Sequence, residues 1–253
     1  MNIDHYLSVL EVKNRAPSLD FLNDLIKAHL KSISFNNLAV YFRPGQILNL
    51  ELDPLFEKVI LNREGGYCFE NNKVFFYLLK NLGFDVSPFA ARVLYGQSGD
   101  IPRTHRMTVV VLDGKRYVAD VGFGRFTPPV AVPFESEEPG LFSIEKKSDS
   151  YLLQVQKDDE KFSLYNFDEG HYQESDFFVA NYYTNTHPNS KFVKNLILSR
   201  QEEGVVELIN GKIYSRITGK EREDMEIKGS EEFSSILKKF GIQKNFDFNK
   251  LYL

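Results

Sequence analysis

The sequence is poor in cysteine: its 253 residues include one Cys, and there is no Trp. A single thiol cannot form an intramolecular disulfide, and it cannot supply the several thiolates of a zinc cluster. The sequence also contains no run of ~18 apolar residues, the length needed to span a membrane, and no basic segment before an apolar stretch at its start. We therefore expect a cytoplasmic protein without a bound metal.

An excess of positive charge is also missing, since 31 Lys and Arg stand against 35 Asp and Glu, for a formal net charge of −4. Proteins that bind nucleic-acid backbones need clustered Lys and Arg. Neither nucleic acid nor membrane is therefore an expected partner. The 42% of hydrophobic residues suffice, at this length, for one large core or two to three smaller ones.

The first third of the chain carries a helical pattern. Apolar residues recur at spacings of three and four between Pro17 and Ile33, behind Ser18 as an N-cap. A second such stretch follows Cys68 and ends at Gly83, a residue type suited to stopping a helix. These patterns predict a helical N-terminal region.

After Pro88 the sequence changes to short runs rich in Val, Phe, Tyr and Leu, which are typical of antiparallel strands. The predicted strands cover 89–95, 106–112, 115–121, 151–157 and 161–167. A hairpin centred on Asn210-Gly211 and a helix capped by Ser230 close the chain. The sequence thus predicts an α+β fold with a helical region, a β region and a small mixed unit.

Cys68 follows two glycines, in Gly65-Gly66-Tyr67-Cys68, and begins a predicted helix. Glycines allow a sharp turn, and the free N–H groups and dipole at a helix N-terminus favour a thiolate. A lone cysteine can equally be a small apolar core residue. The spacing alone leaves both interpretations open.

A second pattern lies in residues 105–122, where Asp113-Gly114 predicts a tight two-residue turn. Extending the pairing outward from this turn puts His105 and Asp120 on one face as diagonal neighbours. A carboxylate there can orient the imidazole. A Cys with a His base and an Asp partner is a general layout for acyl transfer through a thioester.

The other ionisable candidates receive structural interpretations. No hairpin register places a carboxylate beside the four remaining histidines, His5, His29, His171 and His187, so we expect surface or structural roles for them. Glu70 is expected to be a charge on a helix face.

Several segments together resemble the arylamine N-acetyltransferase family of the bacterial type. They are Gly65-Gly66-Tyr67-Cys68, Pro102-Arg103-Thr104-His105, Asp120-Val121-Gly122-Phe123-Gly124, Phe35 with Asn37-Leu38, Ala180-Asn181-Tyr182-Tyr183-Thr184 through His187-Pro188, and Phe192-Val193-Lys194-Asn195-Leu196. The resemblance implies a triad arranged as in cysteine proteases. It also implies a helical bundle over 1–86 that carries Cys68, an antiparallel β-barrel over 87–192 that carries His105 and Asp120, and an α/β lid over 193–253.

The resemblance further implies a ping-pong reaction of xenobiotic metabolism. Acetyl-coenzyme A, a co-substrate rather than a bound cofactor, acylates Cys68; an arylamine, arylhydroxylamine or arylhydrazine then attacks the thioester. By similarity, the acceptor pocket is formed by Phe35, Tyr67, Phe123, Gly124 and Arg125. Arg103 and Thr104 are the candidate contacts to coenzyme A.

Two positions depart from the family's usual pattern. Glu64 stands where an Arg precedes the glycines in the family, and Asn36 stands where a Glu follows Phe. If that Arg and Glu pair with each other, losing both avoids an unpaired charge, and we expect Arg63 to take over part of the role of the missing Arg. Two alternatives stay open. A silent member that binds coenzyme A or aromatic ligands is favoured if Glu64 prevents activation of Cys68, and a thiol hydrolase or transglutaminase-like enzyme is favoured if peptides supply the acyl group.

Overall fold

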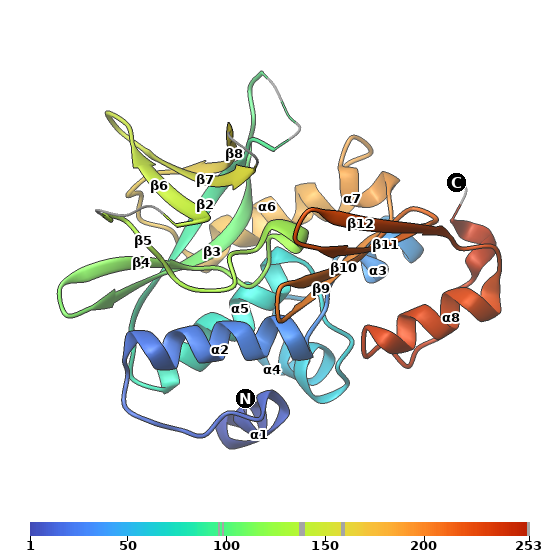
Figure 1. Cartoon of the computed structure of the whole chain (residues 1–253), viewed down its shortest axis with the longest axis horizontal. Helices are drawn as coiled ribbons and strands as arrows, with labels where there is room; N and C mark the ends of the chain where they lie inside the picture. Colours follow the sequence, from blue (N-terminus) through green and yellow to red (C-terminus); the bar gives the residue numbers. More distant parts are fainter. Residues whose placement is uncertain (96, 98, 137–139, 158–159, 252–253) are drawn as a thin grey trace.

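The computed structural model describes residues 1–95, 97, 99–136, 140–157 and 160–251. Figure 1 shows a helical region below a strongly curled sheet, with a second sheet and helix α8 to one side. The expected α+β class is confirmed. None of the helices in the described ranges is long and apolar enough to cross a membrane.

The N-terminal region is helical, as the periodicity predicts. Its elements are α1 (Ile3–Leu10), α2 (Leu19–Ser32), α3 (Leu38–Phe42), α4 (Leu52–Phe56), the π-helical turn η1 (Glu57–Leu61) and α5 (Cys68–Asn81). The hydroxyl of Ser18 accepts a hydrogen bond from the Phe21 N–H, and Gly83 after α5 has a φ of 87°, so both predicted helix boundaries are confirmed. The buried faces of these helices share one core.

The central sheet has seven antiparallel strands in the order β5-β4-β3-β2-β8-β7-β6. Its strands are β2 (Asp85–Val93), β3 (Arg103–Leu112), β4 (Lys115–Ala119), β5 (Val132–Pro133), β6 (Phe142–Lys146), β7 (Tyr151–Lys157) and β8 (Glu160–Phe167). The edge strands β5 and β6 come close to each other, so the sheet curls nearly into a barrel around an apolar core of its own.

The β3–β4 hairpin has the predicted register. Leu112 pairs with Lys115, and the pairing continues to Thr108 opposite Ala119. Asp113 and Gly114 both have positive φ, 51° and 73°, as a two-residue type I′ turn requires.

The second sheet has the order β1-β9-β10-β11-β12. Its strands are β1 (Phe35–Asn36), β9 (Ile197–Glu202), β10 (Val205–Asn210), β11 (Ile213–Thr218) and β12 (Glu221–Glu226). Strand β1 pairs with β9, so the sheet connects the N-terminal helical region to the C-terminal unit. Helix α8 (Ser230–Lys239) and the 3₁₀ turn η3 (Phe248–Lys250) pack on it through a third core.

Two local predictions in this unit were wrong by one residue. The turn consists of Gly211-Lys212 rather than Asn210-Gly211, because Asn210 still pairs with both Ile197 and Ile213. In α8, Ser230 is the first helical residue and Gly229 the N-cap.

Helix α6 (Glu174–Thr186), the short α7 (Lys191–Lys194) and the 3₁₀ turn η2 (Gly124–Phe126) complete the fold. Glu174 binds two elements to α6. Its carboxylate accepts two hydrogen bonds from the buried Arg106 of β3, at 2.8 and 3.0 Å, and pairs with Lys73 of α5 at 2.7 Å. These charge-assisted hydrogen bonds hold α5, β3 and α6 together.

Candidate active site

The hairpin brings His105 and Asp120 into contact. The His105 Nε2 and Asp120 Oδ2 atoms are 2.6 Å apart, and both side chains are buried. The diagonal pair predicted from the turn therefore exists, and the carboxylate fixes the orientation of the ring.

Three further donors hold the Asp120 carboxylate. Its Oδ1 accepts hydrogen bonds from Asn72 Nδ2 at 2.9 Å and from the Gly122 N–H at 2.8 Å, and its Oδ2 accepts one from the Tyr165 hydroxyl at 3.1 Å. A buried carboxylate with this many donors is favoured in its charged form.

The pKa shifts of the pair agree with an ion pair. Burial alone would lower the pKa of His105, but the charge and hydrogen bond of Asp120, together with Cys68, raise it to about 10. Burial alone would raise the pKa of Asp120, but His105, Asn72 and the Gly122 N–H bring it below its usual value. At neutral pH the imidazole is therefore protonated and the carboxyl ionised.

Cys68 is the first residue of α5, at the helix end where backbone N–H groups are free. Its sulfur lies 3.6 Å from the Thr104 carbonyl oxygen, and its hydrogen bond to His105 contributes to the raised pKa of that ring. Gly122 packs against the same turn, since a Cβ there would lie 2.9 Å from the Cys68 Cα. A residue with a side chain at position 122 would push the helix away from the hairpin.

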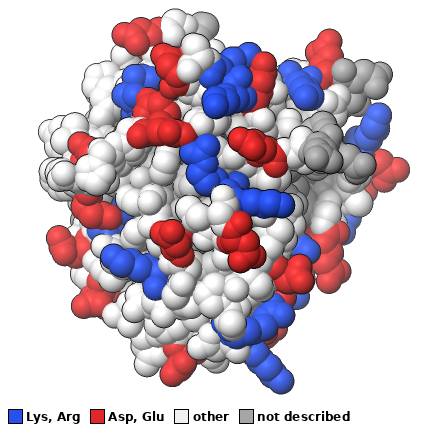
Figure 2. All heavy atoms as spheres, turned by 90° about the vertical axis from the view of Figure 1, so that its left-hand side faces the viewer, with Lys and Arg blue, Asp and Glu red and all other residues white. Residues whose placement is uncertain are grey.

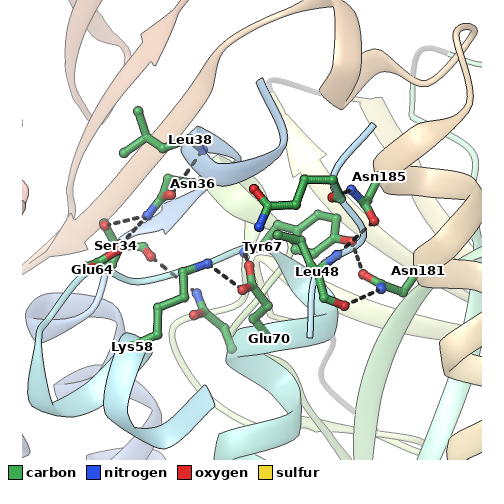
Figure 3. Close-up of polar contacts among 12 residues, drawn as sticks. Ser34, Asn36, Leu38, Leu48, Lys58, Glu64, Tyr67, Glu70, Asn181 and Asn185 are labelled. Carbon is green, nitrogen blue, oxygen red and sulfur yellow. Dashed lines mark hydrogen bonds and ion pairs between the residues drawn. The ribbon is translucent and has the colours of Figure 1, made fainter. Parts of the chain in front are cut away.

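The first turn of α5 is held by an ion pair that the sequence does not predict (Figure 3). The buried Glu70 accepts a hydrogen bond from the Tyr67 N–H at 3.2 Å and pairs with Lys58 of η1 at 2.5 Å. Glu70 is a charged residue on α5, as expected, but it is buried and caps the helix, a role that the expectation of a helix-face charge did not include.

The loop before Cys68 is held by Asn36. Its Nδ2 donates to the Glu64 carbonyl oxygen at 2.8 Å and to the Ser34 hydroxyl at 3.2 Å, while the Glu64 carboxylate lies 3.5 Å from Lys244 Nζ. The expectation for Arg63 was wrong: its side chain is exposed and forms no hydrogen bond or ion pair within the described ranges. The Asn36 side chain thus holds the loop through hydrogen bonds of its amide and carries no charge.

Three of the five expected acceptor-pocket residues, Phe123, Gly124 and Arg125, are consecutive, and the other two, Phe35 and Tyr67, come from elsewhere in the chain. Phe123 packs edge-on against His105, with ring centroids 5.1 Å apart, and Arg125 stacks on Phe126 close by. Phe35 lies against Gly124, where a Cβ would be 3.4 Å from its ring. Tyr67 is fully buried, and its hydroxyl donates to Asn181 (Figure 3).

The two candidate coenzyme contacts differ in their surroundings. Arg103 forms an ion pair with Asp168 and lies over the Tyr172 ring. The Thr104 carbonyl faces the sulfur of Cys68.

Sequence reasoning missed several residues of the site. Asn72 lies four positions after Cys68, so both share one face of α5, and this spacing was a usable signal. Tyr165 and Gln201 had none, because they come from β8 and β9. Gln201 donates 3.1 Å hydrogen bonds to the Gly124 and Thr127 carbonyls and so holds the loop around η2.

No group of three or more His, Cys, Asp or Glu in the described part of the chain could hold a metal ion.

Comparison with known proteins identifies the family. The profile of the N-acetyltransferase family matches residues 18–248. The arylamine N-acetyltransferase of Mycobacterium bovis is 36% identical over 71% of this chain and 67% of its own length. The Salmonella typhimurium protein named arylamine N-acetyltransferase / N-hydroxyarylamine O-acetyltransferase is 33% identical, over 73% of this chain and 67% of that protein.

A solved structure agrees. The Mycobacterium marinum arylamine N-acetyltransferase in complex with CoA matches with a TM-score of 0.91 and 26% identity, over 99% of this chain and 97% of that one. The chain belongs to the arylamine N-acetyltransferase family. The resemblance noted in its motifs is thereby confirmed.

Proposed function

We propose that this chain transfers the acetyl group of acetyl-coenzyme A to arylamines through a thioester on Cys68. The observation that carries the proposal is the buried His105–Asp120 ion pair beside Cys68 at the start of α5. The names of the relatives support the acceptors, arylamines and N-hydroxyarylamines, and the CoA complex of the M. marinum enzyme supports the donor.

In the first half-reaction the Cys68 thiolate attacks the acetyl carbonyl carbon. The new S–C bond forms, the S–C bond to coenzyme A breaks, and His105 gives its proton to the departing coenzyme thiolate. His105 is then neutral and can act as a base.

In the second half-reaction the amine nitrogen attacks the thioester. The N–C bond forms, the bond to the Cys68 sulfur breaks, and the proton of the amine passes to His105, which restores the ion pair. Asp120 holds the ring and stabilises its cation in both halves, while Asn72 and Tyr165 position the carboxylate.

The remaining assignments belong to the same proposal. The acceptor pocket is formed by Phe35, Tyr67, Phe123, Gly124 and Arg125. Its aromatic walls suit an aromatic amine. Arg103 and Thr104 contact coenzyme A. The helical bundle covers residues 1–86, the β-barrel 87–192 and the α/β lid 193–253. The protein acts in the cytoplasm on xenobiotic amines.

Intact-mass measurement tests the proposal. Acetyl-coenzyme A should add one acetyl group to the protein, aniline should remove it with formation of acetanilide, and Cys68→Ser should abolish the aniline-labile adduct. Absence of any adduct would support a silent member of the family. Acylation by a peptide amide, with none by acetyl-coenzyme A, would support a thiol hydrolase or transglutaminase-like enzyme.

A further inference from the structure

A pocket of about 250 Å³ lies between α3, α4, the first turn of α5 and the segment that follows α8. Its lining residues include six that Figure 3 labels: Asn36, Leu38, Leu48, Lys58, Glu64 and Glu70. Cys68, His105 and Asp120 are not among them. The pocket is therefore a place separate from the candidate active site.

The pocket lies behind the catalytic helix turn rather than in front of it. Cys68 and Glu70 are two positions apart, and two helical residues differ by about 200° around the axis, so their side chains leave opposite sides of α5. The Cys68 sulfur faces Thr104 on β3, whereas the Glu70 carboxylate faces Lys58 on η1. A molecule in the pocket thus contacts the cap of α5 without reaching the sulfur.

The charged residues that line the pocket include one more cation than carboxylates. They comprise three cations, Arg43, Lys58 and Lys244, and two carboxylates, Glu64 and Glu70. Lys58 is tightly paired with Glu70 at 2.5 Å, and Lys244 lies a looser 3.5 Å from Glu64. Since three positive and two negative groups leave a net +1, an anion is the complementary ligand.

Arg43 is the cation that remains for such a ligand. It follows α3 at the exposed rim, and its guanidinium forms no hydrogen bond or ion pair with residues in the described ranges. A guanidinium binds a carboxylate with two parallel hydrogen bonds. Lys244, which is held only loosely, is close enough to the same pocket to add its charge.

The rest of the wall is mostly apolar, apart from the amides of Asn36 and Asn49. Leu38, Ala39, Pro54, Leu55, Ile242 and Phe246 provide hydrocarbon surface. Pockets for drug-sized ligands enclose about 300–1,000 Å³, so this one suits a smaller molecule and cannot enclose coenzyme A. Apolar walls below a cationic rim fit a hydrocarbon body that ends in one carboxylate.

We infer that this pocket is a binding site for a small organic carboxylate with an apolar body, separate from the site of acetyl transfer. The carboxylate binds Arg43 and Lys244, and the body lies against Leu38, Ile242 and Phe246. The inference needs neither a thioester nor an acetyl donor, so it stands or falls independently of the proposed function.

Pentanoate is a suitable probe, with pentan-1-ol as its uncharged counterpart. In ¹⁵N NMR titrations of the whole protein, millimolar pentanoate should shift backbone amides of residues 38–43, 55–58 and 242–246, and pentan-1-ol should shift them much less. Arg43→Gln should weaken pentanoate binding roughly tenfold or more, because it removes a charge-assisted hydrogen-bonded pair. Lys244→Gln should weaken it by a smaller factor.

Arg125→Gln is the matched control, since it removes an arginine at the candidate active site and should leave the pentanoate affinity unchanged. Amide spectra of the free variants establish that each is folded. The inference fails if shifts are confined to the surroundings of His105 and Phe123, if Arg43→Gln binds as tightly as the unchanged protein, or if pentan-1-ol binds as well as pentanoate. Absence of shifts at millimolar pentanoate would also overturn it.

Discussion

The β3–β4 hairpin and the first turn of α5 each provide half of the candidate active site, but they position their residues by different means. The hairpin brings His105 into contact with Asp120 through a local turn and the regular pairing of β3 with β4. The turn of α5 depends on Lys58 and Asn36, which lie 12 and 28 positions from the residues they bind. One half is thus built by neighbours in sequence, the other by contacts that only folding creates.

The face seen in Figure 2 shows how the molecule carries its charge outside this site: acidic and basic side chains are interspersed, without a large area of one sign. Charged side chains matter structurally where they are buried, as at Glu70 and Arg106.

The largest expected effect comes from the hairpin side. Asp120→Asn should lower the rate of Cys68 acetylation by about 10³-fold or more, because the amide cannot stabilise the His105 cation. Tyr165→Phe removes a single hydrogen bond to the same carboxylate and should cost about tenfold or less. Stopped-flow acetylation measures both; equal losses in the two variants would contradict the central role of the carboxylate charge.

The second effect concerns the α5 side. Lys58→Met leaves the buried Glu70 carboxylate without its cation and should lower the free energy of unfolding by about 3 kcal/mol. Adding Glu70→Gln should recover most of the loss, because the amide oxygen still accepts from the Tyr67 N–H. Urea denaturation measures this double-mutant cycle.

Lys31→Met is the control for Lys58, because Lys31 pairs with Glu202 on the surface and should leave stability unchanged. A loss for Lys58→Met no larger than that of the control would refute the capping role of the ion pair.

The third effect tests the contact that joins the two halves. Burial alone would raise the pKa of Glu174, but Arg106 and then Lys73 bring it down to about 2 from an ordinary 4.5. A lowered folded-state pKa means that the stabilisation is fully present above about pH 4.5 and is lost as the pH falls through about 2.

Glu174→Gln should therefore destabilise the protein at pH 7 by about 1–2 kcal/mol, a figure reduced because the carboxylate is partly exposed to solvent. The difference from the unchanged protein should shrink steadily below pH 4.5 in urea denaturation. A difference that is constant down to pH 3 would show that the charge of Glu174 is not what joins α5 to β3.

The smallest effect belongs to the hairpin turn. Gly114→Ala places a side chain at a φ of 73° with no atom within 4 Å, so only backbone strain opposes it, at about 1 kcal/mol. Gly140→Ala is the matched control, because this exposed glycine has no positive φ and an added Cβ would lie 3.9 Å from the Phe142 carbonyl oxygen, an ordinary van der Waals contact. Thermal unfolding should separate the two; equal shifts would mean that the left-handed turn does not limit the hairpin.

Helix boundaries and the hairpin register could be predicted because they depend on near neighbours. The Ser18 hydroxyl accepts its hydrogen bond from the N–H of Phe21, only three positions later, and the Asp113-Gly114 turn determines the pairing of the strands on either side of it. The Asn210-Gly211 turn shows the limit of such reasoning. There a strand from elsewhere, β9, pairs with Asn210 and keeps it in β10, so the turn moves one residue on.

The sequence alone determined the α+β class, the pairing of His105 with Asp120 and the place of Cys68 at a helix start, because periodicity, turn chemistry and alternation act over a few residues. Only the tertiary structure decided that the sulfur meets the ring, that Lys58 and Glu70 secure the turn of α5, and that Arg43 borders a pocket behind it. Those contacts join residues far apart in the chain, and no local pattern encodes which distant side chain will lie within reach once the cores have packed.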